Sequence, residues 1–137
     1  MKESRRKFLS AVTFAGLTLP SFSVFSRAGE KSSEKEVLVH QVYFWLKSGL
    51  SKEDVLKFEN GVKSLLKIKT IKYGKVGKPG ATTQRPVIDS SYSYSLLTVF
   101  EDVKGHDQYQ VDPIHEKFLK DCKELWEKVV VYDSQSF

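Results

Sequence analysis

The chain has 137 residues, which is enough for one domain, and its formal net charge is +5. Its first 28 residues hold five basic side chains and one acidic side chain, so the remainder carries 17 basic and 16 acidic side chains. This near-balance removes the electrostatic argument for nucleic-acid binding. The one cysteine, Cys122, excludes an intrachain disulfide.

The first 28 residues are typical of an export signal. The stretch SRRKFLS resembles the twin-arginine pattern, with Arg5 and Arg6 as the arginine pair and serine in place of the usual final lysine. The apolar stretch that follows, residues 11–25, is shorter than the ~20 residues of a membrane span, and a basic start before a short apolar region indicates a signal peptide. We therefore expect an exported protein, periplasmic or secreted, with a linker at 29–36 and no stable membrane span after cleavage.

Residues 37–46 predict a strand, because β-branched and aromatic residues dominate VLVHQVYFWL. Its two alternating faces are both largely apolar, so we expect both to be covered. Ser51 begins a variant of the capping box and predicts a helix whose apolar residues recur at helical spacing up to Leu66. Residues 71–76 predict a second short strand, and 77–91, rich in glycine and proline, a long loop.

The second half of the chain predicts four more elements. Residues 91–100 (SYSYSLLTVF) form the third expected strand, and 103–110 a short helix. A further helix is expected over 112–128, followed by a final strand at 129–133 and a tail at 134–137.

This order of strands and helices predicts a ferredoxin-like α+β fold, in which helices cover one face of an antiparallel four-stranded sheet. The opposite face still carries apolar residues, and VVVY at 129–132 has no polar alternation. A second copy of the sheet is the economical cover for that face. We therefore expect a homodimer in which two sheets form a dimeric α+β barrel.

His115 is the main candidate for chemistry. Asp112 suits the N-cap of a helix and Pro113 its first position, which places His115 in the first turn. The helix dipole there disfavours a charged imidazole, and a neutral ring is what a general base requires. Tyr109 lies just before this helix, and a base and a phenol in one pocket can take a proton and stabilise an enolate oxygen. The alternative is that Asp112 only caps the helix and His115 only packs.

The other histidines and two tyrosines are weaker candidates. His40 lies on an apolar strand face, as a pocket residue or as a core histidine with one polar partner. Tyr92 and Tyr94 are expected on one face of the third strand, where their hydroxyls either meet a ligand or find a backbone partner. His106 is expected in a solvated turn. The three histidines lie on separate elements without HxxxH or HExxH spacing, so neither a metal nor a cofactor is expected.

The stretches HQVYFWLK, YSLLTVFED, YQVDPIHEKF and VVVYD resemble, in order and spacing, the stress-responsive A/B barrel (Dabb) family across 37–133. The resemblance implies a dimeric α+β barrel but no single function. A plant member of the family performs an aldol cyclisation with a histidine base and a tyrosine, and these fall on His115 and Tyr109. The strand-one histidine of many members falls on His40.

Two departures from the family pattern change the polar lining of any pocket. Asp112 stands where many members have a histidine before the proline, and Tyr94 where the plant cyclase has a strand-three histidine.

Three functions follow as expectations. The first is an exported Dabb-domain protein, linked to stress, that binds a small apolar organic molecule between sheet and helices, with pocket residues His40, Tyr92, Tyr94 and Asp112. The second is an enzyme of lyase, cyclase or monooxygenase type, with His115 as base and Tyr109 as its partner in the lyase or cyclase case. The third is a non-catalytic interaction protein. A cavity of ~300–1,000 Å³ that holds both His115 and Tyr109 favours the first two.

Overall fold

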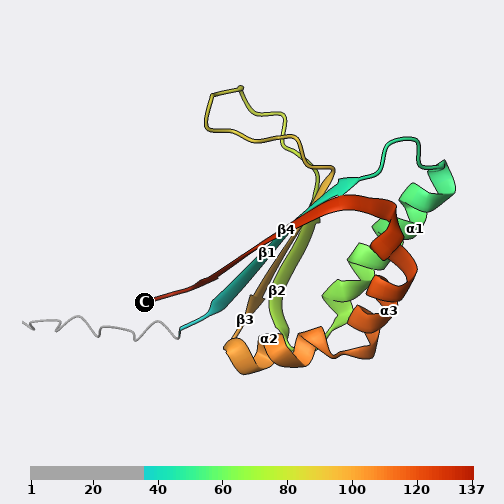
Figure 1. Ribbon diagram of the computed structural model, residues 1–137. Helices are drawn as coiled ribbons and strands as arrows, with labels where there is room; N and C mark the ends of the chain where they lie inside the picture. Colours follow the sequence, from blue (N-terminus) through green and yellow to red (C-terminus); the bar gives the residue numbers. More distant parts are fainter. Residues whose placement is uncertain (1–35) are drawn as a thin grey trace, which may run out of the picture. The chain divides into compact units, whose positions relative to one another are not determined.

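The computed structural model describes residues 36–137 (Figure 1), so the predicted export signal, with Arg5 and Arg6, lies outside the described residues, as does 29–35 of the predicted linker. The elements of the described part are β1 (Leu38–Leu46), α1 (Lys52–Ser64), the 3-10 turn η1 (Leu65–Lys67), β2 (Ile71–Gly77), β3 (Tyr94–Phe100), α2 (Val103–Gln110), α3 (Pro113–Cys122), the 3-10 turn η2 (Lys123–Leu125) and β4 (Trp126–Gln135). None of the helices in this part of the chain is long and apolar enough to span a membrane.

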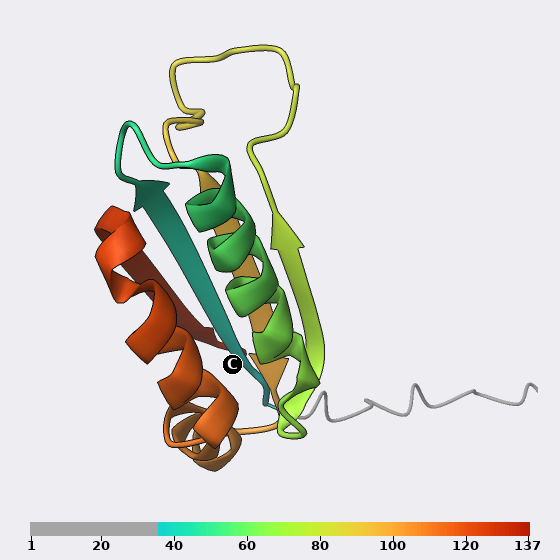
Figure 2. The ribbon, with the colours of Figure 1, turned by 90° about the vertical axis from the view of Figure 1, so that its right-hand side faces the viewer.

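The four strands form one antiparallel sheet in the order β2-β3-β1-β4, so β1 and β3 are central. Figure 2 shows α1 and α3 side by side on one face of this sheet, with α2 at one end. This confirms the predicted ferredoxin-like α+β fold. The connection between β2 and β3 extends beyond the opposite end of the sheet from α2.

The burial of β1 follows the alternation in its sequence. Its side chains at alternate positions point toward the helices and are buried, whereas those between them are partly exposed on the other face. Because β3 alternates in the same phase, the two central strands supply one continuous apolar floor under the helices. The buried residues of this floor are Leu38, Val42, Phe44, Tyr94, Leu96 and Phe100.

The two long helices approach each other closely at Gly61. A Cβ atom at this position would lie 2.8 Å from the Sγ atom of Cys122 and 3.0 Å from Cδ2 of Phe118. The absence of a side chain on α1 therefore lets α3 pack directly against it. The buried thiol of Cys122 serves this contact as a core side chain, as its helical spacing predicts.

The end of α3 differs from the sequence-based prediction. The helix ends at Cys122 rather than near Lys128, and β4 begins at Trp126 and continues to Gln135, past the expected end at Asp133. In the sequence, the apolar residues continue at helical spacing through the intervening 3-10 turn. The sequence pattern alone therefore does not show where the helix ends. The Trp126 ring stacks on Phe118 with 5.7 Å between ring centroids, which fixes the start of the strand.

The third strand also starts later than expected, at Tyr94 instead of Ser91. Tyr92 precedes the strand and contacts Tyr43 and Trp45, which lie on the face without helices. The prediction that Tyr92 and Tyr94 share one face is therefore wrong, because the alternation of β3 does not extend back to Tyr92.

The face of the sheet without helices carries large side chains that remain partly exposed. Tyr43 meets the Tyr132 ring of β4 edge-on, and the Tyr132 side chain is largely exposed. Further apolar residues of this face alternate along β1, β3 and β4 with the residues that point toward the helices, namely Val39, Trp45, Leu97, Val99 and Val130. Within the described chain, no element covers this face.

Replacing Gly61 by alanine is expected to destabilise the domain. In a helix whose glycine faces open space, the same change stabilises the helix by about 0.8–1 kcal/mol. The new methyl group would overlap Cys122 and Phe118, and overpacking of this kind costs about 1–3 kcal/mol. Denaturant unfolding of both proteins measures the difference in unfolding free energy.

The exposed neighbour Asn60 supplies the matched control, since Asn60→Ala is expected to change the unfolding free energy by no more than about 0.5 kcal/mol. Adding Cys122→Ala to the Gly61→Ala variant removes one of the two overlapping groups, so their effects are expected not to add. A Gly61→Ala protein as stable as the wild type would contradict the close approach of the helices.

Candidate functional site

A cavity of about 220 Å³ lies between α3 and the sheet beneath it. It opens along β4, where Val129 and Val131 face the helix layer but remain 42% and 45% exposed. These two valines lie directly opposite Phe44 and Val42 of β1, so the helices cover the central strands and leave β4 partly open. The lining is mostly apolar, with His40, Tyr109, Gln110 and His115 as its polar members.

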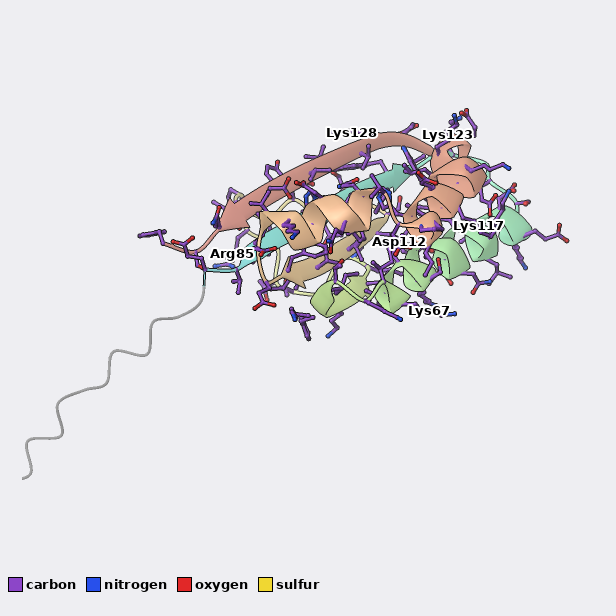
Figure 3. The ribbon with its side chains drawn as sticks, turned by 90° about the horizontal axis from the view of Figure 1, so that it is seen from below. Lys67, Arg85, Asp112, Lys117, Lys123 and Lys128 are labelled. Atoms are coloured by element: carbon purple, nitrogen blue, oxygen red, sulfur yellow. The ribbon has the colours of Figure 1, made fainter. Side chains whose placement is uncertain are left out.

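The first turn of α3 places His115 in this cavity. The Asp112 carboxylate accepts a hydrogen bond of 2.8 Å from the backbone N–H of Ile114, and Pro113 begins the helix, as predicted. Figure 3 shows Asp112 at the junction between α2 and α3. His115 is buried, and its Nδ1 atom has no hydrogen-bond partner among residues 36–137. Asp112 itself does not line the cavity.

Tyr109 lies in the last turn of α2 and is fully buried. Its ring centroid is 4.7 Å from that of His115, so the two side chains that were predicted to work together are neighbours in one cavity. Burial raises the pKa of the Tyr109 hydroxyl, which therefore stays protonated at neutral pH.

The surroundings of His115 favour its neutral form. Burial lowers the pKa of the imidazole, because removal from water penalises its charged form. The nearby His40 and His106 lower this pKa further, whereas the Gln110 backbone and the Asp112 carboxylate act in the opposite direction. The net result is a pKa below 6.5.

His40 is held by a carboxylate from the neighbouring strand. The pairing of β1 with β4 sets His40 opposite Asp133, and His40 Nδ1 lies 2.6 Å from Asp133 Oδ1. Burial lowers the pKa of His40 and the nearby His106 lowers it as well, while the hydrogen bond and charge of Asp133 raise it. The buried Thr98 hydroxyl donates a 3.3 Å hydrogen bond to the His40 carbonyl, so this hydroxyl and the Nδ1 atom of His40 each have a partner.

His106 is not the solvated turn residue that its sequence context predicts. It lies in α2, whose N-cap Asp102 accepts a 2.7 Å hydrogen bond from the backbone N–H of Gly105. This helix packs the His106 ring 4.9 Å from His40 and 5.4 Å from Phe100, measured between ring centroids. His40, His106 and Asp133 each offer a ligand atom, and these atoms lie within 4.8 Å of one another.

The two other tyrosine candidates lie apart from His115. The Tyr94 hydroxyl donates a 2.6 Å hydrogen bond to Glu59 on α1, and the ammonium group of Lys78 lies 4.9 Å from the centroid of the Tyr94 ring. Burial and the bond to Glu59 raise the pKa of Tyr94. Tyr92 lines a separate hollow on the face without helices.

A larger hollow, about 580 Å³, is a groove between α1 and α3 on the outer side of the helix layer. Exposed Lys57, Lys67 and Lys117 surround it, and Figure 3 shows Lys67 and Lys117 pointing outward from the helix layer. Lys117 is already paired with Asp121. The groove holds no buried unpaired polar group. We therefore place the functional site in the smaller, apolar cavity.

Sequence reasoning missed two polar side chains that belong to this region, His106 and Asp133. One feature of the sequence could have pointed to Asp133. A final strand that pairs antiparallel with β1 must place some residue of β4 opposite His40. The register that selects Asp133 depends on an irregularity at Trp45 and Leu46, which no sequence pattern reveals. His106 carried no signal, since the packing of α2 decides its burial.

Comparison with solved structures places this fold among known proteins. A hydroxynitrile lyase from Passiflora edulis has a TM-score of 0.63 at 21% identity, covering 75% of this chain and 95% of that chain. A Dabb family protein with a ferredoxin-like fold from Mesorhizobium loti has a TM-score of 0.60 at 22% identity, covering 74% and 98%. A dimeric ferredoxin-like protein of unknown function from Thermobifida fusca has a TM-score of 0.60 at 14% identity, covering 75% and 93%.

At these identities the solved structures show the shared fold alone. No curated protein matches the chain in sequence. The model of one family, the Stress Responsive A/B Barrel Domain or Dabb, matches residues 38–136. This match confirms the resemblance seen in the sequence, and the chain belongs to the stress-responsive A/B barrel (Dabb) family.

Proposed function

We propose that the protein binds a small, mostly apolar organic molecule in the cavity beside His115 and removes a proton from it. The observation that carries this proposal is the pairing of a buried imidazole with a buried phenol, 4.7 Å apart, on the wall of one apolar cavity. A base of lowered pKa and a protonated hydroxyl are the two groups that lyase and cyclase chemistry requires.

The atoms of His115 have distinct tasks in this proposal. Nδ1 is sealed from solvent, which leaves Nε2 as the nitrogen that a molecule in the cavity can reach. Nε2 takes a proton from a hydroxyl group or from a carbon next to a carbonyl. The Tyr109 hydroxyl donates a hydrogen bond to the oxygen on which negative charge develops. This division resembles the lyase and cyclase roles implied by the family, and the solved hydroxynitrile lyase shares the fold.

The size of the cavity limits the ligand. Its volume of about 220 Å³ is below the range of ~300–1,000 Å³ that holds drug-sized ligands. A cavity of ~150 Å³ is large enough for benzene, so this one suits a single substituted ring or a short aliphatic chain. Its opening along β4 provides a route of entry. The presence of the cavity favours a ligand-handling role over one of interaction alone.

We also propose that the protein is a homodimer formed through the face without helices. That face presents aromatic and aliphatic side chains that the described chain leaves partly exposed, among them Tyr43, Leu97 and Tyr132. A second copy of the same face would remove them from water, which is the main driving force of association. Export by the twin-arginine route, with Arg5 and Arg6 as its signal, and a link to stress remain parts of the proposal that rest on sequence alone.

Replacing His115 by asparagine is expected to lower turnover by at least about a hundredfold, because it removes the base. Replacing Tyr109 by phenylalanine, which keeps the ring, is expected to lower kcat by a similar factor through loss of the hydrogen-bond donor. A suitable assay follows release of aldehyde from a panel of aromatic and aliphatic hydroxynitriles, together with enolisation of small ketones.

Tyr94→Phe is the control, because the Tyr94 hydroxyl is bonded to Glu59 outside the cavity. This variant is expected to keep wild-type turnover. Fluorescence or calorimetric titration with a small aromatic aldehyde separates binding from chemistry. If the wild type binds the aldehyde but turns over no compound of the panel, the protein is a binder and the catalytic part of the proposal is wrong.

The pH dependence of kcat/KM is expected to report the His115 base. Turnover requires the neutral ring, so the rate rises with pH and reaches a plateau, with its midpoint below 6.5 because burial lowers the pKa of His115. The groups facing His115 that shift this midpoint are His40 from β1, His106 from α2 and Asp112 at the start of α3. A midpoint above 6.5, or a rate that falls as pH rises through 6–7, would contradict His115 as base.

Substituting Leu97 by lysine is expected to convert the dimer into a monomer, because it places a charge in the middle of the face without helices. Light scattering coupled to size-exclusion chromatography measures the mass at a fixed protein concentration. The control is Leu56→Lys, at an exposed position of α1. A wild-type monomer, or dissociation of the Leu56 variant alone, would contradict the proposed interface.

A further inference from the structure

Three side chains of the types that bind metal ions converge near one end of the sheet, one each from α2, the start of β1 and the end of β4. His40, His106 and Asp133 come from these three elements, and their ligand atoms all lie within 4.8 Å of one another. In residues 36–137 no other group of three histidine, cysteine or carboxylate side chains meets this condition. Since α2, β1 and β4 are far apart in sequence, spacing motifs for metal sites do not detect the cluster.

The cluster is held in place by the fold. The register between β1 and β4 sets His40 against Asp133, whose Oδ1 atom lies 2.6 Å from His40 Nδ1. Ring packing sets His106 against His40, with the centroids 4.9 Å apart, and against Phe100 at 5.4 Å. Two of the three side chains are therefore fixed by burial or packing before any ion arrives, which lowers the entropic cost of binding.

We propose that His40, His106 and Asp133 bind a divalent first-row transition-metal ion of the Zn²⁺ class. Two imidazoles and one carboxylate are the ligands that Zn²⁺, Co²⁺ and Fe²⁺ take in sites with open coordination positions. Ca²⁺ and Mg²⁺ prefer all-oxygen ligand sets, which this cluster does not supply. The proposal stands apart from the proposed function, because neither His115 nor Tyr109 belongs to the cluster.

The geometry needs only a small adjustment. Zinc binds imidazole nitrogen at ~2.0–2.1 Å and carboxylate oxygen at ~2.0–2.2 Å, which places two ligands of one tetrahedral ion about 3.3 Å apart. His40 Nδ1 and Asp133 Oδ1 are closer than this because they share a proton. An incoming ion takes the place of that proton at Nδ1, and His40 stays neutral because its other nitrogen, Nε2, then carries the one proton of the ring. The Asp133 carboxylate, whose side chain is 47% exposed, moves back to make room for the ion.

The partners of His106 are also exchangeable. One of its ring nitrogens, Nε2, lies 3.0 Å from the exposed Gln110 amide, and the other, Nδ1, lies 3.6 Å from the exposed Asp107 carboxylate. Either interaction can be replaced by water or retained beside a bound ion. The exposed side of Asp133 gives the ion a path from solvent, and water completes its coordination. Because His40 also lines the cavity, a bound ion would lie close to the cavity wall.

Isothermal titration of the full chain with Zn²⁺, after removal of any affinity tag and dialysis against a chelator, tests this proposal. The expected result is one ion per chain. Replacement of His106 by asparagine, and separately of Asp133 by asparagine, is expected to weaken binding by at least about a hundredfold. Both variants retain similar shape and hydrogen-bonding capacity, and circular dichroism checks that each one folds.

The matched control is His115→Asn, which removes a buried histidine of the same region that offers no ligand to the cluster. This variant is expected to bind Zn²⁺ as the wild type does. Titration with Co²⁺ gives an independent readout, because the absorption of the bound ion reports nitrogen ligands and is expected to disappear in the His106 variant. A wild type that takes up no ion, or variants of His106 and Asp133 that bind as tightly as the wild type, would overturn the proposal.

Discussion

The close packing of α1 against α3 at Gly61 is the contact on which the cavity depends. Because no side chain intervenes, Cys122 and Phe118 lie directly against α1, and this fixes the position of α3 over the sheet. The two helices then cover the central strands but not β4, whose valines stay partly open. The absence of a side chain at Gly61 thus determines where the apolar cavity forms and which end of α3 lines it.

The polar groups of the site are positioned by two different kinds of structure. Tyr109 and His115 come from the junction of α2 and α3, where the Asp112 cap and Pro113 set the direction of the chain. His40 and Asp133 come instead from the pairing of two strands. Local geometry therefore supplies the candidate base and its donor, while the sheet supplies a carboxylate–histidine pair beside them. Burial lowers the pKa of both His40 and His115 and so favours the neutral form of each imidazole.

The fold was predictable because strong alternation in β1 and β3 and the cap residues of α1 and α3 carry local signals of strand and helix. Tyr109 and His115 were predictable as neighbours because six residues and one turn separate them. The end of α3 was not, since the 3-10 turn continues the apolar spacing of a helix. Asp133 and His106 were not predictable as parts of the site, because strand register positions Asp133 and the packing of α2 positions His106. No local sequence pattern indicates that register or that packing.

The pairing of β1 with β4 also has a consequence for how the domain is made. His40 and Asp133 are separated by 93 residues, and β4 leaves the ribosome after every other element of the domain. Until then β1 lacks one of its two neighbours, and closing so long a loop costs conformational entropy before any contact is gained. The junction that carries Tyr109 and His115 can form early, whereas the histidine–carboxylate pair forms only when the sheet is completed. The order of synthesis therefore delivers the candidate base before the strand that borders the opening of the cavity.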